Sequence, residues 1–296
     1  MEQLLLHNYI EIGTFKIYYY AICIVTGFLA CAMFAIPLFK KRGFEKDLIM
    51  DLLIAVIPCS IVLARLWYVL MDIDEFMTDG AFDFLKAINI RTGGMAIHGG
   101  VCGGALGLFI VGKIKKIKFS ALGDMGAALL PLGQGVGRLG NFFNQEVYGG
   151  VVPPDKAWFP YATFIEADGN YHVALCFHEM FFNLLLFALI YVFLFNYKGK
   201  RNAYAISAYF IGYGAIRAAM EPQRASQYNM GELILGMPTM FWLSLVVIAG
   251  GIAILTVNIV RDVKEKNYWW KTFFDAFKKK KEPETAEETG GKNDEK

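Results

Sequence analysis

The stretch Gly133–Gly149, GQGVGRLGNFFNQEVYG, lies in a hydrophobic segment yet carries an arginine, a glutamate, two asparagines and two glutamines. On a helix, four of its polar residues share one narrow stripe, because their spacings are four, three and four. They are Gln134, Arg138, Asn141 and Gln145. A neighbouring stripe of glycines would let another helix pack closely. It consists of Gly133, Gly137 and Gly140. Because charge inside a membrane is functional by default, we favour a buried polar site over a helix-packing motif with one structural arginine.

The rest of the chain has the composition of a membrane protein. It has 296 residues, of which 56% are hydrophobic, and a mean hydropathy of +0.40. Its apolar residues come in runs of about the twenty residues that a helix needs to cross a bilayer. We therefore predict an all-α polytopic membrane protein, a bundle of about seven transmembrane helices. The predicted spans are 17–39, 48–70, 93–112, 120–143, 175–196, 203–220 and 238–260.

The connections between these spans alternate in charge. Basic residues follow the first, third, fifth and seventh spans, as in Lys40-Lys41-Arg42, and the other loops are poor in Lys and Arg. Because positive loops stay in the cytoplasm, we expect the N-terminus outside and the C-terminus inside, with a small extracytoplasmic loop region. The longest such loop, 145–174, has turn residues, and the alternation from Tyr161 to Ile165 suggests a short hairpin. The stretch before Lys16 could lie on the outer surface of the membrane.

The chain divides into a membrane domain, 1–266, and a cytoplasmic tail, 267–296. Aromatic residues among lysines at the start of the tail favour an amphipathic helix on the inner leaflet. From Glu282 onward almost nothing is apolar, which predicts disorder, and we expect the part after Lys281 to be dispensable for activity. The five cysteines show no CxxC spacing, so neither a zinc site nor a redox pair is predicted.

Polar residues from six spans reach the same depth, in the outer half of the predicted bundle. They are Tyr20, Arg65, His98, Arg138, Glu179, and the pair Arg217 and Glu221, which share a helix face. This convergence predicts one polar cavity. Structural roles remain open for several of them. Arg138 could pair with Glu146 or Glu179, Arg217 with Glu221, and His98 could be a bonded core histidine. We take Arg65 as structural, and Asp124 as suited to the N-terminus of its own helix.

The chemistry of such a cavity indicates a class of substrate. Arginines attract anions, and the guanidinium fork matches phosphate. At the depth of the outer leaflet, the abundant phosphate is that of a phospholipid head group. A histidine and glutamates nearby could move a proton, so the residues suggest transfer chemistry on a phospholipid, with arginine stabilising the leaving phosphate.

At these residues the sequence resembles the prolipoprotein diacylglyceryl transferases of bacteria. The signature of that family, GRxGNFxNxExxG, is matched at every fixed position from Gly137 to Gly149. The family's HGG is present as His98-Gly99-Gly100, and its early tyrosine resembles Tyr20. The resemblance runs from about residue 10 to 262 and also covers Glu179, Arg217, Glu221 and Arg224.

The resemblance implies the reaction and its partners. A diacylglyceryl group would move from phosphatidylglycerol to the lipobox cysteine that follows the signal peptide of a preprolipoprotein, and glycerol phosphate would leave. The enzyme would sit in the bacterial cytoplasmic membrane among bilayer lipids, and neither a cofactor, a metal nor a nucleic acid is implied. The expected catalytic residues are His98 as candidate base, Arg138 and Arg217. The expected substrate-binding residues are Tyr20, Arg138, Asn141, Asn144, Glu146, Gly149 and Glu221.

Two other classes of protein compete with this interpretation. A secondary transporter for an anion would also hold arginines in a bundle, but it predicts an inverted repeat and a site near the midplane. Neither is visible in the sequence. A non-catalytic scaffold would hold the same charges in inert pairs. Orienting an arginine is the alternative role for Glu146 or Glu221, and the residue that takes the proton stays open.

Overall fold

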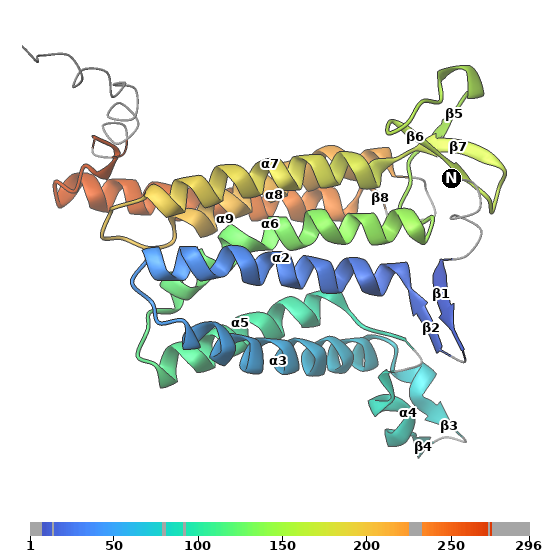
Figure 1. The fold of residues 1–296 in the computed structure, drawn as a ribbon, viewed down its shortest axis with the longest axis horizontal. Coiled ribbons are helices and arrows are strands. Elements are labelled where there is room, and N and C mark those ends of the chain that lie inside the picture. The colour runs from blue at the N-terminus through green and yellow to red at the C-terminus, as the bar shows by residue number, and fades with distance from the viewer. Residues whose placement is uncertain are drawn as a thin grey trace, which may run out of the picture.

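The protein is a bundle of long helices with short hairpins gathered at one end (Figure 1). The computed structural model describes residues 8–13, 15–78, 81–90, 93–224, 233–271 and 273. Its long helices are α2 (Tyr19–Lys41), α3 (Asp47–Met71), α5 (Ile97–Ile114), α6 (Phe119–Phe143), α7 (Leu175–Asn196), α8 (Tyr204–Met220) and α9 (Thr239–Lys264). None of these helices differs from its predicted span by more than four residues at either end.

Five of these helices, α2, α3, α5, α7 and α9, are long and apolar enough to cross a membrane. The protein is therefore a multi-pass membrane protein. Helix α6 carries the polar stripe, and α8 has only 17 residues. Membrane crossing by these two helices, and with it the number of seven, stays a prediction.

Glycine spacing explains which helices pack most closely. Gly99, Gly103 and Gly107 recur every fourth residue on α5, and a Cβ on any of them would run into the backbone of α3. Helices α3 and α5 therefore form a tight pair, which lies apart from α7, α8 and α9 with α2 and α6 between (Figure 1). The glycine stripe of α6 packs on α2 at two of its three positions. Gly133 lies against Cys31 and Gly140 against the Tyr20 ring, and Gly137 has open space.

A buried carboxylate corrects one expectation. Asp124 is 2% exposed and does not act at the start of its own helix. Its Oδ2 and Oδ1 accept hydrogen bonds from the backbone N–H groups of Ala203 (2.7 Å) and Ile206 (3.0 Å), at the N-terminus of α8. Because four N–H groups at a helix start lack partners within the helix, a carboxylate from α6 satisfies two of them. The apolar core surrounds this end of the bundle, with Leu38, Leu122 and Leu194 fully buried.

The hairpins lie at the other end of the bundle. They are β1 (Tyr9–Ile12) with β2 (Phe15–Tyr18), β3 (Met77–Thr78) with β4 (Ala81–Phe82), the sheet of β5 (Val151–Val152), β7 (Asn170–Val173) and β6 (Ala162–Ile165) in that order, and β8 (Leu233–Ile234) with β9 (Met237–Pro238). Short helices join them, namely η1 (Ile73–Phe76), α4 (Phe84–Ile88), η3 (Pro154–Lys156) and η4 (Glu221–Gln223). The hairpin predicted from Tyr161 to Ile165 is confirmed as β6–β7. Tyr9–Ile12 pairs with Phe15–Tyr18 as the hairpin β1–β2, which the sequence did not predict.

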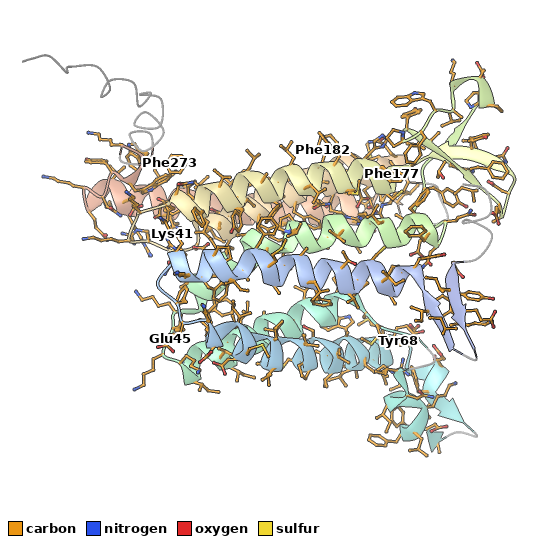
Figure 2. All side chains as sticks on the ribbon, viewed as in Figure 1. Lys41, Glu45, Tyr68, Phe177, Phe182 and Phe273 are labelled. Carbon is orange, nitrogen blue, oxygen red and sulfur yellow. The ribbon has the colours of Figure 1, made fainter. Side chains whose placement is uncertain are left out.

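Basic residues gather at one end of the bundle, and the hairpins lie at the other. Lys41 and Glu45 lie at the end opposite Tyr68 and Phe177, which lie towards the hairpins (Figure 2). At the basic end Trp269, beyond α9, packs its ring on those of Tyr197 and Tyr204, with centroids 5.0 and 5.1 Å away. Trp269, near the start of the predicted tail, is therefore packed against the helix bundle. The predictions for Glu282 and beyond lie outside the described residues.

Candidate functional site

One carboxylate gathers three arginines near the hairpin end. Glu179 on α7 is 1% exposed. It forms ion pairs with Arg138 of α6, with Arg224 Nη2 at 2.8 Å and with Arg217 Nη1 of α8 at 3.8 Å. The sequence singled out Glu179 as one possible partner of Arg138, and the structure confirms that pair. The sequence did not predict that the same carboxylate also forms ion pairs with Arg217 and Arg224.

A second buried carboxylate completes the cluster. Glu221, also 1% exposed, pairs with Arg217 Nη2 at 2.7 Å and with Arg224 Nε at 3.3 Å. The predicted pairing of Arg217 with Glu221, four residues apart, is confirmed. Three arginines thus face two glutamates, and the ion-paired cluster keeps one net positive charge. Buried charges need such pairing.

The signature turn holds a third carboxylate by hydrogen bonds. Arg138 Nη1 donates to Asn141 Oδ1 at 3.1 Å, and Asn141 Nδ2 donates to Glu146 Oε1 at 2.7 Å. Asn144 Nδ2 lies 3.4 Å from the same oxygen. Four predicted site residues, Arg138, Asn141, Asn144 and Glu146, are therefore brought together. The chain Arg138–Asn141–Glu146 links the arginine cluster to the turn that follows α6.

One residue of the predicted polar stripe does not belong to it. Helix α6 ends at Phe143, and Gln145 and Val147 have φ of +50° and +59°. Such left-handed residues turn the chain away from the helix axis. Gln145 points instead to the hairpin loop, where its Oε1 accepts a hydrogen bond from Glu166 N at 2.9 Å. Helical spacing assigned Gln145 wrongly because the helix stops before it.

Gly149 acts through its backbone in this structure. Its N–H donates to Val173 O at 2.9 Å, and its carbonyl lies 2.8 Å from His172 Nδ1. It also forms a β-bridge with Arg224, and a Cβ here would lie 2.8 Å from Gln223 O. A side chain would therefore push the signature turn away from the segment that carries Arg224. The predicted contact of Gly149 with substrate stays a prediction.

A long cleft begins at the arginine cluster. It measures about 540 Å³ and lies between the α2–α6 and α3–α5 pairs. Its polar end is formed by Tyr20, Gln134, Arg138, Asn141 and Tyr213. The whole cleft extends roughly 29 Å along α6, from Asn141 to Leu122, and apolar side chains line its last part, roughly 18 Å from Gln134 to Leu122. The open space at Gly137 is part of this cleft.

Two predicted residues of the α3–α5 pair lie apart from the cluster. Arg65 is 6% exposed and donates to five backbone carbonyls, those of Lys86, Ala87, Asn89, Gly93 and Gly94, at 2.6–3.0 Å. These contacts support the structural role expected for it. His98, the second residue of α5, is exposed, and its imidazole has no hydrogen bond to another described residue. Its neighbour Ile97 lines the cleft.

The contacts of Arg65 predict a stability effect. Arg65→Ala should destabilise the protein by about 3 kcal/mol or more, because five backbone carbonyls lose the charged donor that a buried arginine supplies. The measurement is the melting temperature of the purified protein in detergent. Arg42→Ala is the matched control, because Arg42 Nη1 donates one hydrogen bond, 2.8 Å long, to Tyr197 O. Equal melting temperatures for the two variants would contradict a special role for Arg65.

The sequence signals for Glu179 and Arg224 were present but incomplete. Glu179 is an acidic residue in an apolar helix, and Arg224 follows Glu221 by three residues. Spacing within one helix could not show that Glu179 pairs with both Arg138 and Arg224, which come from other segments. Among the described residues, no three His, Cys, Asp or Glu side chains gather as metal ligands would. The site is an arginine–glutamate cluster at the mouth of an apolar cleft.

Comparisons with known proteins agree with this geometry. A family model described as prolipoprotein diacylglyceryl transferase matches residues 7–257. A protein of Clostridium perfringens (strain 13 / Type A), named phosphatidylglycerol–prolipoprotein diacylglyceryl transferase 1, is 33% identical over 262 residues, which cover 86% of this chain and 95% of the relative. A protein of the same name, without the numeral, from Streptococcus pneumoniae (strain Hungary19A-6) is 33% identical over 250 residues, 83% of this chain and 91% of the relative. The chain belongs to the prolipoprotein diacylglyceryl transferase family.

Proposed function

We propose that this transferase moves the diacylglyceryl group of phosphatidylglycerol to the lipobox cysteine of a preprolipoprotein. The observation that carries the proposal is the placement of Arg138, at the polar end of a cleft that is otherwise apolar. A phospholipid has the same division, with an anionic phosphate at one end and acyl chains behind it. The relatives named above bear the name of this activity.

Arg138 is the phosphate-binding residue in this proposal. It lines the cleft, its side chain keeps 20% of its surface exposed, and Glu179 fixes its guanidinium from behind. Arg217 and Arg224 lie behind the same carboxylate and supply further positive charge. With Glu146, which Asn141 links to Arg138, the site holds three arginines and three glutamates, so the attraction for the phosphodiester lies at the partly exposed Arg138 guanidinium. Because this charge is organised before the substrate arrives, it stabilises the leaving phosphate without rearrangement.

The reaction needs a thiolate as well as a leaving group. The cysteine thiol gives its proton to a base, and its sulfur attacks the glycerol carbon that carries the phosphate ester. The C–O bond breaks, a thioether forms, and glycerol phosphate leaves with the bonding electrons. His98 is the proposed base, since it follows Ile97 at the cleft and is free of hydrogen bonds to the described residues. Glu221 instead orients Arg217 and Arg224.

His98→Gln tests the assignment of the base. We expect a loss of transfer rate of about a hundredfold or more and a flattened pH–rate profile, because glutamine cannot take a proton. The rate should be measured with saturating phosphatidylglycerol at a series of pH values. An unchanged profile would assign His98 a structural role. Tyr18→Phe, outside the cleft lining, serves as a control that should leave the profile as it is.

The proposed setting is the bacterial cytoplasmic membrane, with seven spans and the arginine cluster in the outer leaflet. Lysines and arginines at the end opposite the hairpins support this orientation. The signal peptide of a preprolipoprotein would bring its cysteine to the outer face, where the cleft has its polar end. Tyr20, Asn141, Asn144, Glu146, Gly149 and Glu221 are the proposed substrate-binding and positioning residues beside Arg138.

One assay separates the three candidate classes of protein. Purified protein is mixed with phosphatidylglycerol and a peptide that contains a lipobox cysteine, and the peptide mass is followed. A transferase adds a diacylglyceryl group to the thiol, whereas a transporter or a scaffold leaves the peptide unchanged. A peptide with serine in place of the cysteine is the control. No lipidated product from the cysteine peptide would overturn the proposed function.

A further inference from the structure

A second cavity lies at the basic end of the bundle, far from the arginine cluster along the helices. It measures about 490 Å³ and is formed where α5 ends and α6 begins. Three lysines line it together with apolar side chains and one glycine. The lining residues are Phe109, Gly112, Lys113, Lys116, Ile117, Lys118 and Phe119. No acidic residue contributes to the lining.

The lysines of this turn divide into two groups. Lys115 forms an ion pair with Asp51 of α3 at 2.6 Å, and it is the lysine of the turn that does not line the cavity. That contact raises the pKa of Lys115, as do Glu45 and Asp47 of the neighbouring segment. Lys113, Lys116 and Lys118 line the cavity, and none has an ion pair with a described residue. The acidic groups near the turn therefore interact with Lys115. The positive charges of the three lysines at the cavity are not neutralised by ion pairs with described residues.

The backbone of the turn explains why Lys116 is informative. Lys116 has a φ of +57°, and Ile117 N donates to Gly112 O at 2.8 Å, so the end of α5 is a Schellman motif with Lys116 in its left-handed position. Glycine is the usual residue there, because a Cβ disfavours this conformation. A lysine at a position that favours glycine gives up stability. The side chain of Lys116 lines the cavity, so its replacement by glycine removes a charge there without straining the backbone.

Two aromatic rings in the lining of the cavity indicate the kind of ligand. Phe109 and Phe119 are both partly exposed, and Lys113 Nζ lies 5.4 Å from the centroid of the Phe109 ring. A ligand that uses the whole cavity needs negative charge for three ammonium groups and an apolar body for two aromatic rings. An anionic phospholipid combines both at the level of its head group, and juxtamembrane lysines attract such lipids.

We propose that this cavity binds the head group of an anionic phospholipid. The three lysines hold its phosphate, and its glycerol and upper acyl chains lie on Phe109 and Phe119. The leaflet would be the cytoplasmic one, which rests on the orientation proposed above, but the binding itself does not. A bound lipid would contact both α5 and α6, and it would stabilise the packing of the α3–α5 pair against α6. This site differs from the catalytic cleft in position, lining residues and leaflet.

Lys116→Gly separates binding from folding. The purified full chain in detergent is titrated with dioleoyl phosphatidic acid and followed by native mass spectrometry, with dioleoyl phosphatidylcholine as the uncharged comparison. Each lysine near an anionic head group contributes roughly fivefold in affinity. We therefore expect Lys116→Gly to bind phosphatidic acid roughly fivefold more weakly. Its melting temperature without lipid should be equal or higher, because glycine suits the left-handed position.

The chain offers a matched control at the end of α9. Lys266 has a φ of +54°, and Asn267 N donates to Asp262 O at 2.8 Å, so Lys266 occupies the same position of the same motif. It does not line the cavity. Lys266→Gly should gain the same stability and keep wild-type affinity. Equal affinities for Lys116→Gly and wild type would overturn the proposal, as would equal losses for the two glycine variants.

Two further measurements distinguish other occupants and the catalytic site. The double variant Lys113→Gln with Lys118→Gln, which leaves the left-handed position untouched, should weaken phosphatidic acid binding by more than tenfold. Arg138→Ala should retain the lysine-dependent binding, whether or not the chain transfers lipid. Displacement of the lipid by millimolar inorganic phosphate would show a free-phosphate site. Much tighter binding after removal of residues 282–296 would show the acidic tail as occupant. Either result would overturn the lipid assignment.

Discussion

Arg138→Ala is expected to abolish diacylglyceryl transfer while the protein still folds and inserts. The side chain lines the polar end of the cleft and is held by Glu179, so its loss removes the charge proposed to meet the leaving phosphate. Removing one preorganised donor to a developing anion costs about 10²–10³ in rate, and a guanidinium can offer two such donors. We expect a loss of about a thousandfold or more, measured as lipidated peptide formed per minute by equal amounts of purified protein.

Folding should survive this change because Glu179 keeps two other arginines. Arg224 Nη2 remains 2.8 Å from its Oε1, and Arg217 Nη1 remains 3.8 Å away. Arg138→Lys is the informative companion, since lysine keeps the charge and loses the planar fork. It should recover part of the rate. Transfer at the wild-type rate by Arg138→Ala would remove Arg138 from the mechanism.

Glu179→Gln should have the largest effect on stability. The substitution keeps the shape of the side chain but leaves three arginines, each at most 20% exposed, with Glu221 as the remaining carboxylate of the cluster. Breaking a buried ion pair costs about 3–5 kcal/mol, because the partner charge stays buried without compensation. We expect a clear fall of the melting temperature in detergent and a loss of transfer activity.

Glu265→Gln is the matched control for this prediction. Glu265 pairs with Arg201 Nη2 at 2.5 Å, but its side chain is 65% exposed. Exposed pairs contribute about 0–1 kcal/mol, so this variant should melt close to wild type. Similar melting temperatures for the two glutamine variants would show that Glu179 does not organise the cluster.

The sequence predicted the helices well because each depends on local composition. Long apolar runs marked the spans, and the glycines of α6 at positions 133 and 140 indicated a close helix contact, which the structure shows to be with α2. Arg138 was identified because a lone charge in an apolar helix needs a partner. These inferences use residues that lie within a few turns of one another, where spacing determines proximity.

The sequence could not predict contacts that join distant segments. Glu179 meets arginines from α6, α8 and the segment after η4, and no spacing within α7 indicates this. Asp124 was wrongly given to its own helix because the start of α8 lies 79 residues later in the chain. Gln145 was misplaced because left-handed residues end the helical register just before the signature turn is complete.

His98 shows how family patterns and geometry can differ in detail. The HGG motif places it beside Gly99, and the structure explains the glycine, whose Cβ would collide with the backbone of α3. The same close packing fixes where α5 begins, and hence where His98 lies. Among the described residues, however, His98 forms no ion pair and no side-chain hydrogen bond with the arginine cluster. Its proposed role as base depends on the substrate that would lie between them.

The most direct test of the central claim is an experimental structure with phosphatidylglycerol bound. The account predicts the lipid phosphate within hydrogen-bonding distance of the Arg138 guanidinium, and the acyl chains along the cleft between α2, α6 and the α3–α5 pair. A phosphate bound elsewhere, with Arg138 engaged by Glu179 alone and the cleft free of acyl chains, would contradict it.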